Sequence, residues 1–222
     1  EMSTSDWSSD VCSSDLGGKM EQPASRFNNT NHRVVDIYSD FDGVISPFEL
    51  RNAVHPELVK PTNQDEPYPI DQRGYHNSIV WSSEMLNQVK DMIDHQPIRW
   101  HWLTSNERWM VALDQAIGIN HDSVDTEAFF DQDSDGGIVG GDRLGAIAVA
   151  LTKRLTDRTK APSRGVVWMD DAPEIRQEPH RVDQLRQMVG EFGVDMLVIN
   201  PDSYKGISRQ EMEQVTDFIA EH

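Results

Sequence analysis

The sequence predicts an α/β protein built on one central parallel sheet, and two observations lead to that prediction. Short apolar, β-prone runs alternate along the chain with segments whose apolar residues recur at helical spacing. Strands that alternate with helices in this way are typical of parallel sheets with right-handed crossovers. In addition, three of the apolar runs end abruptly in polar side chains, at the place where open α/β folds bind their ligands.

The first half of the chain is expected to hold two strands of this sheet and two helices. The first strand is predicted at 33–39, and a Pro-rich irregular region at 45–74 is too long for a simple connection, which predicts a flap. Residues 76–81 read as a short strand of that flap. A helix then begins after an N-cap at Ser82 or Ser83, and its apolar residues recur at helical spacing: Met85, Leu86, Val89, Met92 and Ile93.

The alternation continues after Pro97, which ends that helix. A strand at 98–103 runs into Thr104, and the next helix ends near Ile117 with Gly118 as its stop. The patch at 124–130 is either strand or helix. The remaining predicted elements are a helix at 144–155, a strand at 166–169, a helix at 180–189, a strand at 194–199 and a last helix opened by a Ser208–Glu211 capping box. The tryptophans of these strands, Trp100, Trp102 and Trp168, are expected in the core.

The length of 222 residues is enough for one well-buried domain, but the beginning of the chain differs from the remainder. Residues 1–30 are rich in Ser, Asp, Asn and Gly and are interpreted as a disordered or non-native tail before a single domain at 31–222. The lone cysteine, Cys12, lies in that tail, so disulfides are excluded and a reducing, cytoplasmic compartment is expected. No apolar run approaches the roughly 20 residues of a membrane span.

The net charge restricts the partners that the protein can attract. Lys and Arg number 20 against 38 Asp and Glu, which gives −18 at neutral pH. Such a balance argues against electrostatic capture of nucleic acid or of an anionic membrane. It suits a soluble protein that handles cations.

Three strand ends carry the candidate site. Asp40 and Asp42 follow the first strand with Gly43 after them, Thr104 follows the second, and the pair Asp170–Asp171 follows a later one. Parallel strands bring these ends to the same edge of the sheet. Carboxylates so close together repel one another, so the pattern predicts a bound cation.

These motifs, in this order, resemble the haloacid dehalogenase (HAD) superfamily, and most closely the small HAD domains of Swiss-army-knife RNA-repair-type proteins. The resemblance covers about 33–222, and the stretches that support it are 42–47, 102–104, 167–171 and 200–208. It implies a HAD-like Rossmannoid fold, a three-layer α/β/α arrangement with a small flap or minimal cap. It also implies a magnesium-dependent phosphatase.

The resemblance assigns a role to each residue. Asp40 is the expected nucleophile, which forms an aspartyl-phosphate, and Asp42 is the expected general acid and then general base. Mg²⁺ would be held by Asp40, the backbone carbonyl of Asp42, and the Asp170–Asp171 pair. The Thr104 hydroxyl would hold phosphoryl oxygens in line.

One position departs from the family pattern. The family has a lysine at the start of the helix before the Asp-Asp strand, and here that position holds Arg143, with Lys153 ten residues further along. Arginine keeps the charge but presents a planar fork. Because Lys153 would lie roughly 15 Å from the start of the helix, Arg143 is the preferred replacement.

A second acidic motif, at 131–142, matches the EF-hand loop pattern. It has acids at positions 1, 3, 5 and 12, namely Asp131, Asp133, Asp135 and Asp142, with glycine at position 6. Calcium binding at this loop is one hypothesis. The alternative is a flexible acidic turn, because position 12 is Asp where EF-hands use Glu and because the chain has no second loop to pair with it.

Two classes of function therefore compete. The first is a phosphohydrolase or phosphotransferase acting on a small phosphorylated substrate; RNA ends are suggested by the similar proteins but disfavoured by the charge. The second is a catalytically weak or inactive HAD-fold module that binds cations or partners, which the missing lysine suggests. A phospho-accepting receiver domain fits less well, because there the acidic pair comes on the first strand. The sequence does not indicate the oligomeric state.

Overall fold

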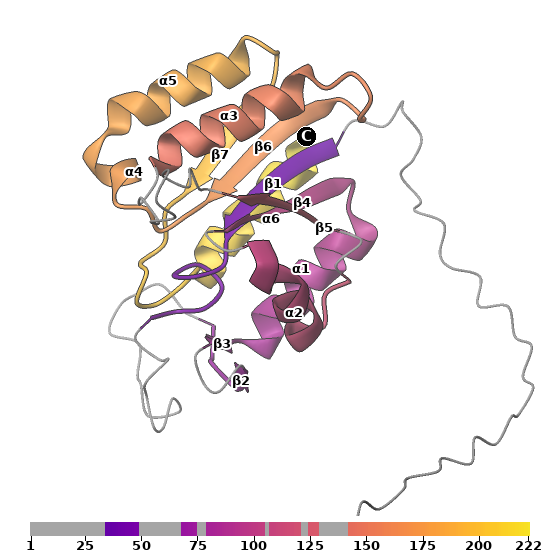
Figure 1. Ribbon diagram of the computed structural model, residues 1–222, viewed down its shortest axis with the longest axis vertical. Helices are drawn as coiled ribbons and strands as arrows, with labels where there is room; N and C mark the ends of the chain where they lie inside the picture. Colours follow the sequence, from indigo (N-terminus) through magenta and orange to yellow (C-terminus); the bar gives the residue numbers. More distant parts are fainter. Residues whose placement is uncertain (1–33, 49–67, 75–78, 105–106, 121–123, 129–141) are drawn as a thin grey trace, which may run out of the picture.

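A five-stranded parallel sheet forms the centre of the protein (Figure 1). The computed structural model describes residues 34–48, 68–74, 79–104, 107–120, 124–128 and 142–222. The strand order is β5-β4-β1-β6-β7, and the strands are β1 Val34–Asp40, β4 Ile98–Thr104, β5 Val124–Ala128, β6 Ser163–Met169 and β7 Asp195–Ile199. All seven residues of β1 are buried, because this strand has a neighbour on each side and helices over both faces.

Helices cover both faces of the sheet. On one face lie α1 (Ser83–His95), α2 (Glu107–Ile117) and α6 (Arg209–Glu221); on the other lie α3 (Arg143–Thr156) and α5 (Pro179–Gly190), preceded by the short α4 (Glu174–Gln177). Alternate residues of a strand face opposite sides of a sheet. Accordingly Ile37 belongs to the α1–α6 core and Tyr38 to the α3–α5 core. The predicted α/β class, with a central parallel sheet between helical layers, is confirmed.

The three tryptophans are core residues, as predicted. Trp100 and Trp102 pack in the α1–α6 core and Trp168 in the α3–α5 core, with no side chain more than 1% exposed. The Trp102 indole N–H donates to the buried Asp114 carboxylate of α2 at 2.9 Å. That bond gives a buried carboxylate a partner, which such a group needs when it is removed from water.

Several helix ends follow the predicted local chemistry. The Ser82 hydroxyl accepts from the Met85 amide at the start of α1, and Gly118 ends α2 with a positive φ of 76°. Ser208 and Glu211 form the predicted capping box at the start of α6. Among the described residues, no helix has both the length and the apolar character needed to cross a bilayer.

The structure also corrects several predicted boundaries. The undecided patch at 124–130 begins with β5, an edge strand that pairs with β4. β6 begins at Ser163, three residues before the predicted start, because pairing with β1 recruits polar residues that have no strand signature of their own. The short helix α4 was not predicted.

The expected flap is described only in part. β2 (Gln72–Gly74) pairs antiparallel with β3 (Ile79–Trp81), and this two-stranded ribbon is separate from the central sheet. The start of the predicted 76–81 strand, residues 49–67 of the flap and the predicted tail at 1–30 lie outside the described residues.

A buried ion-pair network is centred on Asp36 in the N-terminal half of β1, and it was not predicted from the sequence. Asp36 is fully buried, and its Oδ1 accepts from the Arg154 Nε at 2.9 Å, with His101 Nε2 at 3.1 Å and Arg99 Nη1 at 3.5 Å. Burial alone would raise the pKa of Asp36, but the hydrogen bond and charge of His101 and the charge of Arg154 outweigh it and lower that pKa. Asp36 is therefore a charged carboxylate inside the protein.

Candidate metal centre and active site

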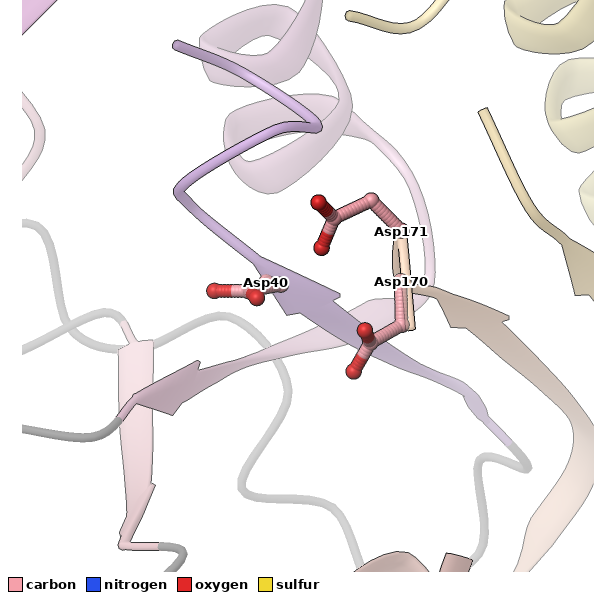
Figure 2. Close-up of side chains that lie close together, drawn as sticks. All are labelled: Asp40, Asp170 and Asp171. Carbon is pink, nitrogen blue, oxygen red and sulfur yellow. The ribbon is translucent and has the colours of Figure 1, made fainter. Parts of the chain in front are cut away.

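Three carboxylates meet at the edge of the sheet formed by the carboxyl ends of its strands. Asp40 is the last residue of β1, and Asp170 and Asp171 directly follow β6, whose Met169 pairs with Ser39. One oxygen from each of the three carboxylates lies within 4.8 Å of the others (Figure 2). Asp40 and Asp170 are buried, and Asp171 is partly buried. We call these three residues the acidic cluster.

Backbone amides and a neighbouring strand hold the cluster in place. Asp40 Oδ1 accepts from the Phe41 amide at 2.6 Å, and Asp170 Oδ1 accepts from the Ala172 amide at 2.8 Å. Asn200, which follows β7, donates its side-chain amide to the Asp170 carbonyl at 2.6 Å. Arg176 of α4 in turn donates to the Asn200 side chain and carbonyl. Neither Asn200 nor Arg176 was predicted as a site residue; the signals for Asn200 were its position after a strand and its place in the 200–208 stretch.

Arg143 is the cation of the cluster. It is the first residue of α3, and its Nη1 donates to Asp40 Oδ2 at 2.7 Å, to Asp170 Oδ1 at 2.5 Å and to Asp171 Oδ1 at 3.3 Å. Lys153, the other candidate for this position, is exposed in the last turn of the same helix. The structure therefore places Arg143, and not Lys153, beside the expected nucleophile.

The pKa values of all three carboxylates of the acidic cluster are raised. Burial, followed by the charge of Asp170, raises the pKa of Asp40 to about 8 in spite of the opposing charge of Arg143. Burial also raises the pKa of Asp170 and Asp171. Burial opposes the charge of Arg143, but Asp170 and Asp40 outweigh it and raise the pKa of that guanidinium. One guanidinium thus faces three carboxylates.

The residues present fit a divalent cation. Oxygen ligands from several carboxylates are what Mg²⁺ and similar hard cations prefer. The second oxygen of Asp170, Oδ2, is buried and has no hydrogen-bond partner among the residues that the structure describes. A buried charged oxygen without a partner costs free energy, and a cation bound at the cluster would remove that cost.

The turn at Asp42 and Gly43 packs directly against the acidic cluster. Gly43 has a φ of 75°, and a Cβ added to it would lie 2.3 Å from Asp171 Oδ2, so only glycine leaves room for that carboxylate. Asp42 is not one of the three clustered carboxylates, but its charge raises the pKa of both Asp40 and Asp171. Its carboxylate therefore lies close enough to act on the same groups.

Substituting Gly43 with alanine is expected to disturb the cluster as well as the fold. The left-handed backbone costs roughly 1–2 kcal/mol for a residue with a Cβ, and Asp171 must also move. Gly193→Ala is the matched control, because Gly193 has a φ of 69° but its Cβ would meet no described atom within 4 Å. Urea unfolding should show a loss in both variants. Isothermal titration with Mg²⁺ should show weaker binding only in Gly43→Ala, and equal binding in the two variants would contradict the packing of Gly43 against Asp171.

Thr104 is placed only by its backbone. It ends β4, and its neighbour Leu103 pairs with Asp40 of β1. The Thr104 backbone thus reaches the same edge of the sheet as the acidic cluster. Its side chain lies outside the described part of the structure, so its expected role stays a prediction.

The second acidic motif is largely outside the described residues, which include neither Asp131, Asp133 nor Asp135. Asp142 is described: it is exposed, directly precedes α3, and its carboxylate accepts from Arg181 of α5. That hydrogen bond lowers the pKa of Asp142. Calcium binding at this loop therefore stays a prediction, and a calcium ion would have to share Asp142 with Arg181.

No protein-family model matches the chain, and no curated protein or solved structure matches it either. The structure itself defines the class: an α/β protein with a parallel five-stranded sheet between helices, and an acidic cluster at the carboxyl ends of two adjacent central strands.

Proposed function

We propose that the protein is a magnesium-dependent phosphohydrolase or phosphotransferase of the HAD-like type that works through an aspartyl-phosphate on Asp40. The observation that carries the proposal is the meeting of Asp40, Asp170 and Asp171 within 4.8 Å at the ligand-binding edge of the sheet. The order of the motifs along the chain supports the same assignment. A small phosphorylated molecule is the proposed substrate, because the net charge of −18 disfavours nucleic acid.

The carboxylates of the acidic cluster, with the Asp42 carbonyl, would hold Mg²⁺, which would neutralise the charge that otherwise repels a phosphoryl group from carboxylates. The protein groups supply the rest of the chemistry. Asp40 Oδ1 is fixed by the Phe41 amide. Such fixed positioning allows an attacking oxygen to be aligned with the phosphorus before the reaction.

In the first step, a carboxylate oxygen of Asp40 attacks the phosphorus, and the bond from phosphorus to the leaving oxygen breaks. Asp42 donates its proton to that leaving oxygen as general acid. The product of this step is an aspartyl-phosphate on Asp40 and a free alcohol.

In the second step, Asp42 takes a proton from a water molecule, and the water oxygen attacks the phosphorus. The bond between phosphorus and Asp40 breaks, which regenerates the carboxylate and releases inorganic phosphate. If an alcohol replaces water, the same step is a phosphotransfer. Arg143 and Thr104 would hold the phosphoryl oxygens in both steps.

Hydrolysis of an aryl phosphate by the purified protein tests the proposal. We expect turnover that requires Mg²⁺, stops in EDTA and falls to the rate of the protein-free control in Asp40→Asn. Asp195→Asn is the matched control, because Asp195 is exposed at the start of β7, at the end of the strand away from the acidic cluster. This variant should keep its activity. Turnover that survives in Asp40→Asn would contradict the proposal.

The second candidate is a non-catalytic module that kept the fold and binds a cation. The observation in its favour is Arg143, whose guanidinium already supplies a positive charge to all three carboxylates. Binding of Mg²⁺ without turnover of a broad panel of phosphorylated metabolites would favour this candidate.

A further inference from the structure

Arg143 touches every carboxylate that a metal ion at the acidic cluster would need. A single nitrogen, Nη1, lies within 3.3 Å of oxygens from Asp40, Asp170 and Asp171. These are the same three residues whose oxygens lie close enough to share one ion. The guanidinium and a divalent ion would therefore draw on the same three carboxylates.

We propose that Arg143 is a built-in counter-cation that competes with the divalent ion for the acidic cluster, so that metal binding requires its guanidinium to move away from the carboxylates. The inference shares the metal site of the proposed function but not its chemistry. It deepens that proposal by assigning Arg143 a role in regulating how the site takes up its metal ion.

Electrostatics and ligand use both set the two cations in competition for the cluster. Two positive charges a few ångströms apart repel strongly, even with an effective dielectric well above that of a dry interior. In addition, Arg143 already takes Asp40 Oδ2 and Asp170 Oδ1 through short hydrogen bonds. An ion bound by the same oxygens would replace those bonds.

The position of Arg143 allows it to leave. Its side chain is 31% exposed, in contrast to the 4% of Arg154, the other arginine that α3 directs at a carboxylate of β1. It stands in the first turn of α3, where the helix dipole disfavours a cation. The hydrogen bonds to the carboxylates oppose that effect, so a divalent cation that takes over those carboxylates would weaken the hold on Arg143.

The unpartnered oxygen of Asp170 indicates that Arg143 does not satisfy the cluster fully. Asp170 is fully buried, yet its Oδ2 finds no hydrogen-bond donor within the described part of the chain. A divalent ion brings a higher charge and can use that oxygen. Arg143 therefore stabilises the protein when no metal is bound and lowers the affinity of the site for the ion.

Calorimetric titration with Mg²⁺ alone, together with thermal unfolding in EDTA and in Mg²⁺, tests this inference without measuring catalysis. Arg143→Gln is expected to bind Mg²⁺ about tenfold more tightly than the wild type or better, since a charge beside the ion is removed. In EDTA it should melt at a lower temperature than the wild type, and Mg²⁺ should raise its melting temperature by more. Arg181→Gln is the matched control. It also removes one positive charge, from a side chain that is 32% exposed and pairs with Asp142 next to the start of α3, and it should bind Mg²⁺ like the wild type.

Each outcome supports or overturns the inference. If Arg143→Gln binds Mg²⁺ as tightly as the wild type or more weakly, the inference is overturned, while the metal site and the proposed function stand. The same holds if Arg181→Gln tightens Mg²⁺ binding as much as Arg143→Gln does. Absence of Mg²⁺ binding in all proteins overturns both the inference and the proposed function. If Arg143→Gln does not fold in EDTA, Arg143→Lys takes its place. Its side chain is shorter and ends in an ammonium group, so it should tighten Mg²⁺ binding by a smaller factor than Gln would. No tightening in this variant would overturn the inference.

Discussion

Replacing Arg154 with methionine is expected to lower the free energy of unfolding by about 3 kcal/mol or more, because removing one partner of a buried ion pair leaves the other charge uncompensated. Arg154 is the closest partner of the buried Asp36, and it also donates to the Ala161 carbonyl at 2.6 Å. His101 and Arg99 stay near Asp36 but at longer distances. Urea unfolding followed by tryptophan fluorescence measures the loss.

A matched surface pair and a double variant separate the buried charge from a general effect of losing an arginine. Arg186 pairs with Asp183 in the open, with exposures of 46% and 72%, so Arg186→Met should change stability by no more than about 0.5 kcal/mol. Adding Asp36→Asn to Arg154→Met should recover part of the loss, because the buried carboxylate that lost its closest partner is then replaced by a neutral amide. A loss in Arg154→Met no larger than that in Arg186→Met would contradict the structural role of this network.

The same network predicts the sign of the pH dependence. The pKa of Asp36 is lower in the folded protein than in the unfolded chain, where the pKa of an aspartate is about 3.9. Its contribution to stability is therefore fully present above that pH and is lost as the pH falls through the lower folded pKa. The difference in stability between the wild type and the double variant should shrink below about pH 4, and a difference that grows in acid would contradict the assignment.

Replacing Asp42 with asparagine is expected to lower the steady-state hydrolysis of an aryl phosphate by about 10²- to 10⁴-fold, the usual contribution of a general acid or base. An aryl leaving group departs easily without a proton, so the loss should fall on the second step, in which Asp42 activates water. A burst of phenolate followed by slow turnover is the expected stopped-flow trace.

Asp202 offers the control for Asp42. It lies in the turn after β7, where it forms an isolated antiparallel bridge with Gly206; Asp42 forms an isolated parallel bridge with Ser46 in the turn after β1. Asp202→Asn should keep its activity. A comparable loss in both variants, or a loss in Asp42→Asn without a burst, would argue against Asp42 as the base.

The sequence predicted those features that depend on local pattern. The alternation of apolar runs predicted the parallel sheet, and the polar ends of β1 and β6 predicted that Asp40 and Asp170 would meet, because parallel neighbours share an edge. The Ser208–Glu211 capping box was also predictable, because its two residues hydrogen-bond to each other within one helical turn.

Features that depend on tertiary packing were not predicted. Arg154 looks like a surface residue of α3, and only the fold shows that it reaches the buried Asp36. Ser163 joins β6 because β1 is there to pair with it. Arg143 was preferred to Lys153 because of its place at the helix start, and it does lie beside Asp40. The contact of one nitrogen with all three carboxylates, however, depends on the angle at which α3 crosses the sheet.

Trapping the phosphorylated protein tests the central claim most directly. Wild type and Asp42→Asn would be mixed with radiolabelled aryl phosphate and Mg²⁺, quenched in acid, and digested for peptide mapping. The account predicts a hydroxylamine-labile label on Asp40, more of it in Asp42→Asn, and none in EDTA. A label on another residue, or continued turnover of Asp42→Asn with no label on Asp40, would contradict it.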